Sequence, residues 1–156
     1  MKHQKFIFKL VLLFLLICNI KSVLSQEEGL LNKTKSQIKI TETKQLYLQG
    51  NIKTALLNYK EIIALNPSST KAHFGISRCY FRLHQFKKAK YHAEIAEKNN
   101  PKVDEDLYYL LGEIYFRLKE LKKSKTNYKK FVSEIKSKQK IKDYSIDLKI
   151  SQLDFA

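Results

Sequence analysis

The residues of this 156-residue chain that could carry out chemistry are a few histidines, the cysteines and a short run of acids. His73, His84 and His92 do not pair at i, i+4 around a carboxylate, so the helical zinc motif is absent. The sequence also contains no glycine-rich phosphate loop and no nucleophile elbow. We therefore expect no enzymatic activity, no cofactor and no metal ion.

The other reactive side chains have structural interpretations. Cys79 stands next to Tyr80 with no neighbouring base, which is typical of a small packing residue. Asp104, Glu105 and Asp106 are predicted to open a helix, where carboxylates complement the helix dipole. The three histidines are expected on helix surfaces, between helices or, for His84, in a turn. None of these groups predicts a catalytic site.

The spacing of small and apolar residues indicates which elements position these side chains. One stripe at steps of three, four and three residues occurs three times, first at Ile52, Ala55, Tyr59 and Ile62, then at Phe86, Ala89, Ala93 and Ala96, then at Leu121, Ser124, Tyr128 and Phe131. The second copy lies 34 residues after the first, and the third lies 35 residues after the second. Such steps mark one face of a helix, so the chain predicts a repeat of helix pairs.

The segments that precede these stripes keep the same offsets. Thr43, Ser77 and Gly112 align as small residues that let the partner helix approach. Pro67 and Pro101 are 34 residues apart, and each ends the second helix of a pair. One pair cannot bury its apolar stripe alone, so successive pairs must stack.

This pattern resembles the tetratricopeptide repeat, a helix–turn–helix family with a period of 34 residues. The matching residues are Gly50, Ile52, Ala55, Tyr59 and Pro67 in the first repeat, Ser77, Tyr80, Phe86, Ala89 and Pro101 in the second, and Tyr108, Leu111, Gly112, Tyr115, Leu121 and Tyr128 in the third. The chain departs from the family at His73, where Trp is common, at His84 and Lys119, where Gly is common, and at Ser124, where Ala is usual.

The resemblance implies an all-α fold, a right-handed α-α superhelix (solenoid) of three helix pairs followed by a C-terminal capping helix. We expect a signal peptide at 1–25, a linker or frayed helix start at 26–35, and the repeat domain at 36–137, with repeats at about 36–69, 70–103 and 105–137. Residues 138–156 are predicted to form the capping helix, because a stack needs a cover over its last interface. An irregular α-hairpin bundle is the alternative fold.

The resemblance also implies a concave groove, lined by the first helix of each pair, that binds a protein or peptide of acidic character. The groove residues are predicted to be Lys44, Tyr47, Lys71, Phe74, Arg78, Phe81, Arg82, Tyr109, Glu113, Phe116 and Arg117. Chaperone-binding members of the family hold a C-terminal carboxylate with Lys and Asn residues. The corresponding places here hold Ile40, Lys44 and Gly75, so that clamp is absent.

The N-terminus predicts export. Lys2, Lys5 and Lys9 give a basic start, residues 10–18 are an unbroken apolar run, and Ser25 offers a small-residue cleavage site. The run is shorter than the roughly 20 residues of a spanning helix. We expect a secreted or periplasmic protein. The alternative is that this segment stays uncleaved as a membrane anchor, which would be the protein's only contact with a membrane.

The chain is strongly basic, with a net charge of +15 that would become +11 after loss of residues 1–25. This charge favours acidic partners. Most of the basic residues are Lys, whereas specific phosphate recognition relies on Arg, and export argues against a nucleic-acid partner. We therefore expect a scaffold in an envelope assembly. The alternatives are an electrostatic binder of anionic surfaces or nucleic acid, and a truncated repeat module of a larger secretion or gliding machine.

Overall fold

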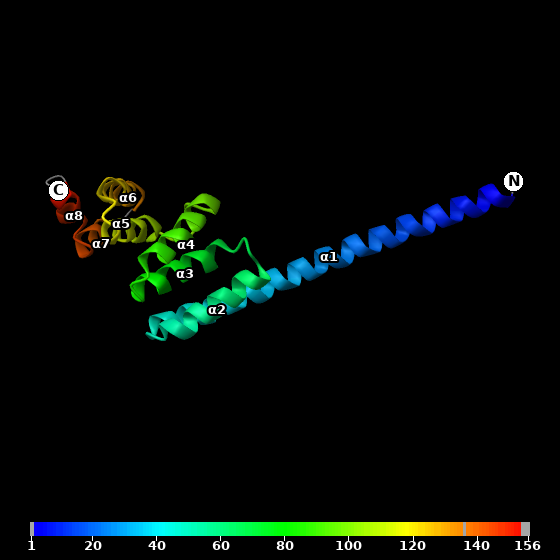
Figure 1. Cartoon of the computed structure of the whole chain (residues 1–156), viewed down its shortest axis with the longest axis horizontal. Coiled ribbons are helices and arrows are strands. Elements are labelled where there is room, and N and C mark those ends of the chain that lie inside the picture. Colours follow the sequence, from blue (N-terminus) through cyan, green and yellow to red (C-terminus); the bar gives the residue numbers. More distant parts are fainter. Residues whose placement is uncertain (1, 136, 154–156) are drawn as a thin grey trace. The chain divides into compact units, whose positions relative to one another are not determined.

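The computed structural model describes residues 2–135 and 137–153, and side chains from residue 14 onward, apart from those of residues 18, 22 and 136. Within these ranges the chain forms eight α-helices and no strand (Figure 1). It divides into two compact units, residues 1–38 and 39–156. The second unit contains the helix pairs and the core.

The first unit is a single helical segment. It belongs to α1 (Lys2–Leu48), which continues into the second unit. Residues 26–35, predicted as a short linker or a frayed helix start, are helical. The predicted basic start and much of the apolar run of the signal peptide lie outside the residues whose side chains are described. Among the described residues, no helix combines the length and the apolar character needed to span a lipid bilayer.

The second unit is an α-α solenoid of helix pairs, as the sequence predicts. The last turns of α1 pair with α2 (Ile52–Leu65), α3 (Thr70–Arg82) pairs with α4 (Phe86–Asn99), and α5 (Leu107–Arg117) pairs with α6 (Leu121–Glu134). Successive pairs also touch, α2 against α3 and α4 against α5. Two short helices follow, α7 (Lys138–Asp143) and α8 (Ile146–Gln152).

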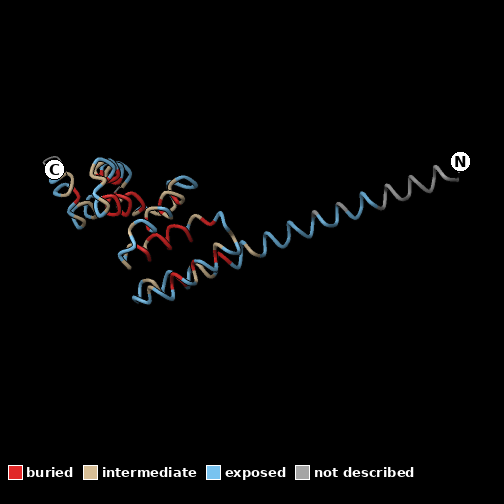
Figure 2. Tube along the Cα trace, viewed as in Figure 1, coloured by how far each residue is buried: buried red, intermediate tan, exposed pale blue. Residues whose placement is uncertain are grey.

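The predicted stripes occupy equivalent places in successive pairs. Ala55, Ala89 and Ser124 are all fully buried where the two helices of a pair approach. A hydroxyl bridges the helices there in two repeats: Ser77 donates to the carbonyl oxygen of Ala89 at 2.8 Å, and Ser124 donates to that of Gly112 at 2.9 Å. Figure 2 shows α3 and α5 as the most continuously buried helices. The repeat pattern is confirmed.

The turn within each pair has the same backbone geometry. Gly50, His84 and Lys119 adopt left-handed φ angles of 85°, 57° and 60°. In the second turn, the N–H of Gln85 donates to the carbonyl of Tyr80 at 2.9 Å, a helix-ending bond repeated in the other two turns. Only glycine adopts this conformation without steric cost. His84 and Lys119 therefore hold strained backbone at the sites where the family commonly has Gly.

The C-terminal cap differs from the single helix that the sequence predicts. It consists of α7 and α8, separated at Ser145, whose φ of 50° breaks the helix; residues 154–156 lie outside the described residues. Ile146 is fully buried. Tyr144 follows Tyr109 by 35 residues, so this segment retains the spacing of the repeats at that position.

The acidic run 104–106 leads into α5, as predicted, but lies outside its first turn. Asp106 is the N-cap residue, and the helix begins at Leu107. Lys140 of α7 forms ion pairs of 2.6 Å with both Glu105 and Asp106. The acids therefore attach the cap to the third repeat.

Candidate functional site

The first helices of the pairs present the eleven predicted groove residues, which we call the groove face. Lys44, Lys71, Arg82, Phe116 and Arg117 are exposed, Tyr47, Arg78, Phe81 and Tyr109 are half-buried, and Phe74 and Glu113 are buried. The repeat spacing places Lys44, Arg78 and Glu113 at one equivalent position, and Tyr47, Phe81 and Phe116 at another. A role in binding stays a prediction for all eleven. The structure decides which of them are accessible.

At the first two repeats the groove face contains an open pocket of about 340 Å³. We call it the α1–α3 pocket. Its lining comes from α1 (Ile40, Thr41, Lys44), α2 (Tyr59), α3 (Lys71, Phe74, Gly75, Arg78) and the connection before α5 (Val103, Asp104). Burial raises the pKa of Tyr59 to about 12, so its hydroxyl stays protonated at neutral pH. The pocket wall is therefore apolar with several cationic groups and one carboxylate.

Arg78 is held in the pocket by two aromatic rings. Its guanidinium lies 4.3 Å from the centre of the Tyr47 ring and 5.7 Å from that of Phe74. Stacking of this kind orients an arginine without using its N–H donors. Among the described residues, no carboxylate forms an ion pair with Arg78. Its donors are available to a ligand.

At the third repeat, two side chains of the C-terminal cap contact the groove face. The Tyr144 ring stacks on Tyr109 with centroids 4.2 Å apart. Lys149 of α8 forms an ion pair with Glu113 and donates to the Tyr109 hydroxyl at 3.0 Å. The Tyr128 hydroxyl also donates to Glu113, at 2.6 Å. Tyr109 and Glu113, predicted to face a partner, are thus engaged by the cap.

The ion pair and hydrogen bonds around Glu113 affect the pKa values of the groups that form them. Burial alone would lower the pKa of Lys149, but its bonds to Glu113 and Tyr109 outweigh burial and raise it. Burial and the bond to Glu113 both raise the pKa of Tyr128. A smaller pocket of about 190 Å³ remains beside Phe116 and Arg117, bounded by Lys149. Sequence reasoning missed Tyr144 and Lys149 as groove residues; the signal was the 35-residue step from Tyr109 to Tyr144.

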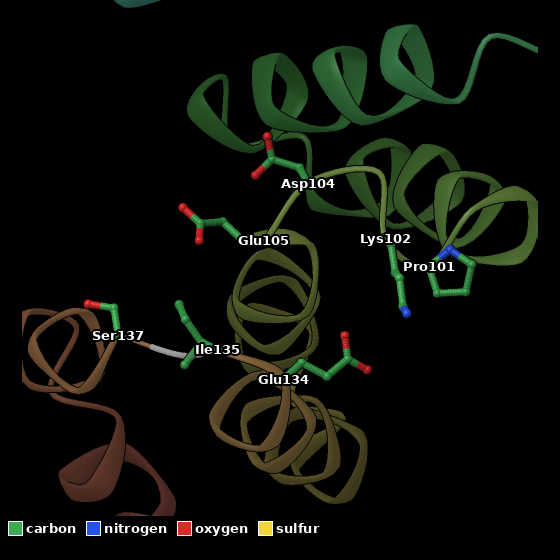
Figure 3. A pocket seen from close by; sticks show the side chains of 7 residues that line it. All are labelled: Pro101, Lys102, Asp104, Glu105, Glu134, Ile135 and Ser137. Carbon is green, nitrogen blue, oxygen red and sulfur yellow. The ribbon is translucent and has the colours of Figure 1, made fainter.

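Another pocket, of about 690 Å³, lies where the α4–α5 connection meets the end of α6. Figure 3 shows its lining residues, Pro101, Lys102, Asp104, Glu105, Glu134, Ile135 and Ser137. Asp104 is already engaged, because its carboxylate accepts the backbone N–H of Asp106 at 3.0 Å. No group of three or more potential metal ligands is found among the described residues.

His73 and His92 contact each other inside the second repeat. Their Nδ1 atoms are 2.9 Å apart, and His73 Nε2 is 3.1 Å from the carbonyl oxygen of Pro67. His73 must donate Nε2–H to that carbonyl, so its Nδ1 accepts the Nδ1–H of His92. Burial, His73 and Lys60 lower the pKa of His92 to about 4. His92 is therefore neutral at physiological pH, and the two rings pack against each other inside the second repeat.

Comparison with known proteins supports the same architecture. The family model of the second ARM domain of tetratricopeptide repeat protein 21 matches residues 2–143. No curated protein matches the chain.

Three solved structures share the fold at low identity. The Yersinia enterocolitica type III secretion chaperone SycD, in complex with a peptide of the translocator YopD, is 13% identical with a TM-score of 0.65 and covers 76% of this chain and 92% of its own. The Arabidopsis OM64 TPR domain is 18% identical with a TM-score of 0.67, at 78% and 96% coverage. The first TPR of Spaghetti (RPAP3), bound to the HSP90 peptide SRMEEVD, is 21% identical with a TM-score of 0.67, at 79% and 95% coverage.

Proposed function

The chain belongs to the family of the second ARM domain of tetratricopeptide repeat protein 21, and from this we propose that it is a non-enzymatic scaffold that binds a protein or peptide on its groove face. The observation that carries the proposal is the α1–α3 pocket, where aromatic rings meet cations that form no ion pair among the described residues. Aromatic side chains and arginine dominate the energetics of protein interfaces. Two neighbours of the same fold, SycD and RPAP3, are described with bound peptides.

The side chains that could react have structural tasks instead. His73 and His92 hydrogen-bond to each other, which fixes their protons. Cys79 is fully buried, and burial raises the pKa of its thiol to about 12, so it is protonated at neutral pH. A protonated thiol is a poor nucleophile. These groups support a binding role over a catalytic one.

The partner we favour is acidic. Lys44, Lys71, Arg82 and Arg117 are exposed on the groove face, and the one acid among the groove residues, Glu113, is already neutralised by Lys149. An acidic partner would gain from this charge in both association rate and orientation.

The proposed setting is the cell envelope, and it rests on the N-terminal sequence alone. A basic start, the apolar run 10–18 and Ser25 fit a secretory signal peptide cleaved before Gln26. The mass of the protein recovered from cells tests this. A chain that begins at Gln26 supports export, and a full-length chain retained with membranes supports an uncleaved anchor.

Site-specific photocrosslinking tests the binding face. The photoreactive amino acid p-benzoylphenylalanine replaces Phe116, which is 43% exposed on the groove face, or Tyr91, which is 62% exposed on α4. We expect a protein adduct from position 116 and none from position 91. The triple variant Arg78→Ala/Arg82→Ala/Arg117→Ala should reduce the adduct.

Two results would contradict the proposal. Equal adducts from both positions would indicate contact without a preferred face. Binding only to polyanions, with a steep loss on adding salt, would favour the alternative of diffuse attraction by the Lys-rich surface.

A further inference from the structure

The turns inside the helix pairs carry a concentration of positive charge outside the eleven groove residues. Six lysines lie there, which we call the basic edge: Lys53, Lys87, Lys88, Lys119, Lys122 and Lys123. Lys53, Lys87 and Lys122 follow one another at steps of 34 and 35 residues. Each is therefore the second residue of the second helix of its pair.

The stacking of the repeats brings these turns to one edge of the second unit. Successive pairs pack against each other, α2 against α3 and α4 against α5, so equivalent positions recur in neighbouring layers. An open pocket of about 550 Å³ joins the second turn to the third. Its lining residues are His84, Gln85, Phe86, Lys87 and Lys88 from the second turn and Leu118 from the third. Lysines of successive repeats thus share one surface.

Most ammonium groups of the basic edge have no acidic partner. All six lysines are exposed. Among the described residues, no ion pair is formed by Lys53, Lys87, Lys88, Lys119 or Lys122. Glu120 is the one acid in segments 49–54, 83–88 and 118–123, and it pairs with both Lys90 and Lys123. Arg82 and Arg117, which end α3 and α5, extend the positive charge toward the groove face.

Folding does not account for this placement of charge. The first turns of α2, α4 and α6 contain no acid, and a lysine there is repelled by the positive end of the helix dipole. The connection between α4 and α5, at the other ends of the helices, has the opposite character. Its residues 100–106 include three acids and one lysine. The charge of the stack is therefore segregated, with its cations gathered at the turns.

We propose that the basic edge binds the phosphate groups of an anionic lipid bilayer. This function goes beyond the proposed binding of a protein on the groove face. Charge complementarity carries it, because each lysine near an anionic bilayer adds to the affinity and three turns present lysines along one edge.

The side chains between the lysines favour a bilayer over a nucleic acid. Leu83, Phe86 and Leu118 are each partly exposed at these turns. A bilayer interface accepts apolar side chains beneath its phosphate groups, and the long lysine stems let the ammonium groups stay at the level of the phosphates. The charged backbone of a nucleic acid offers no such apolar layer.

Co-flotation of the full chain with lipid vesicles measures the binding. Vesicles of phosphatidylcholine are compared with vesicles that also contain phosphatidylglycerol. The edge variant changes one lysine of each repeat: Lys53→Gln/Lys87→Gln/Lys122→Gln. The matched control removes the same charge from three exposed lysines outside the turns: Lys98→Gln/Lys102→Gln/Lys138→Gln.

We expect the chain to bind the anionic vesicles more tightly than the neutral ones. Each lysine near the surface is worth about fivefold in affinity, so the edge variant should bind about a hundredfold more weakly and the control should lose less than about tenfold. Circular dichroism and urea unfolding should show that the edge variant is as stable as the natural chain, because the lysines it lacks oppose the helix dipole.

An introduced tryptophan locates the contact, because the chain contains none of its own. Phe86→Trp places the reporter in the pocket between the second and third turns, and Tyr91→Trp places it farther along α4, where Tyr91 is 62% exposed. Anionic vesicles that contain brominated lipid should quench the fluorescence of Phe86→Trp and leave that of Tyr91→Trp unchanged.

Three results would overturn the inference. Equal losses in the edge variant and the control would show that the charge acts without a preferred edge. Equal binding to neutral and anionic vesicles would assign the contact to the apolar N-terminal segment. Binding of a DNA duplex but not of vesicles, abolished in the edge variant, would identify a nucleic acid as the occupant. Adducts from position 116 test the groove face separately from all three.

Discussion

Replacing Gly75 with alanine would place a methyl group inside the ring of Tyr59. An ideal Cβ on Gly75 would lie 2.3 Å from Cζ of that ring and within 2.6 Å of both Cε atoms. Ordinary contact between such atoms begins near 3.4 Å. Tyr59 is 5% exposed, so the ring cannot swing into solvent, and helix α2 or α3 must move by about 1 Å.

Two opposing effects set the magnitude. Alanine improves the helix propensity of the position by about 1 kcal/mol. Overpacking a well-filled site costs about 1–3 kcal/mol, and the ring is rigid, so the upper part of that range applies. We expect Gly75→Ala to lower the free energy of unfolding by about 1–2 kcal/mol. Because Tyr59 also lines the α1–α3 pocket, binding there should weaken as well.

Urea unfolding followed by circular dichroism measures the change in the free energy of unfolding. A double-mutant cycle with Tyr59→Ala shows whether the clash with the Tyr59 ring causes this change. In the Tyr59→Ala background the clash is gone, so Gly75→Ala should stabilise the domain by about 1 kcal/mol. Gly29→Ala is the matched control, because nothing lies within 4 Å of a Cβ at that helical glycine. Additive effects of Gly75→Ala and Tyr59→Ala would refute the reasoning.

Three further predictions concern the left-handed turns, the histidine pair and the cap. His84→Gly and Lys119→Gly should each raise the free energy of unfolding by about 1 kcal/mol in urea titrations, since glycine relieves the left-handed strain at both turns. Lowering the pH from 6.5 to 4 should destabilise the domain, because an unfolded histidine takes up a proton near 6.5 and folded His92 only near 4. The free energy of unfolding should fall by about 1–2 kcal/mol after allowance for solvent screening. Urea midpoints measured at pH 7 and pH 4.5 should differ less in His92→Gln, because this variant lacks the contribution of His92. Lys149→Gln should lower the free energy of unfolding by about 1–2 kcal/mol, because Glu113 would lose its ion-pair partner; an unchanged free energy would show that the ion pair is not formed.

Much of the solenoid could be predicted from the sequence because the same packing constraints recur in each of the three repeats. Ala55, Ala89 and Ser124 had to be small at the crossing point of each pair, and the 34- and 35-residue steps made this visible. The cap was only partly predictable. The helix break at Ser145 depends on a left-handed backbone in a residue without sequence preference for it.

The candidate site shows most clearly which features the sequence predicts and which depend on tertiary packing. The composition of the groove face, with its rings and cations on the first helix of each pair, follows from sequence spacing, because residues three and four apart share one side of a helix. Whether a given groove residue is available depends on contacts between residues far apart in the chain. Glu113 is engaged because α8 brings Lys149, 36 residues away in the chain, within reach of α5. Arg78 stacks on Tyr47 and Phe74, and it forms no ion pair with any carboxylate among the described residues. Periodicity determined the shape of the stack, and long-range packing, which no local pattern encodes, decided which part of the groove face is left free.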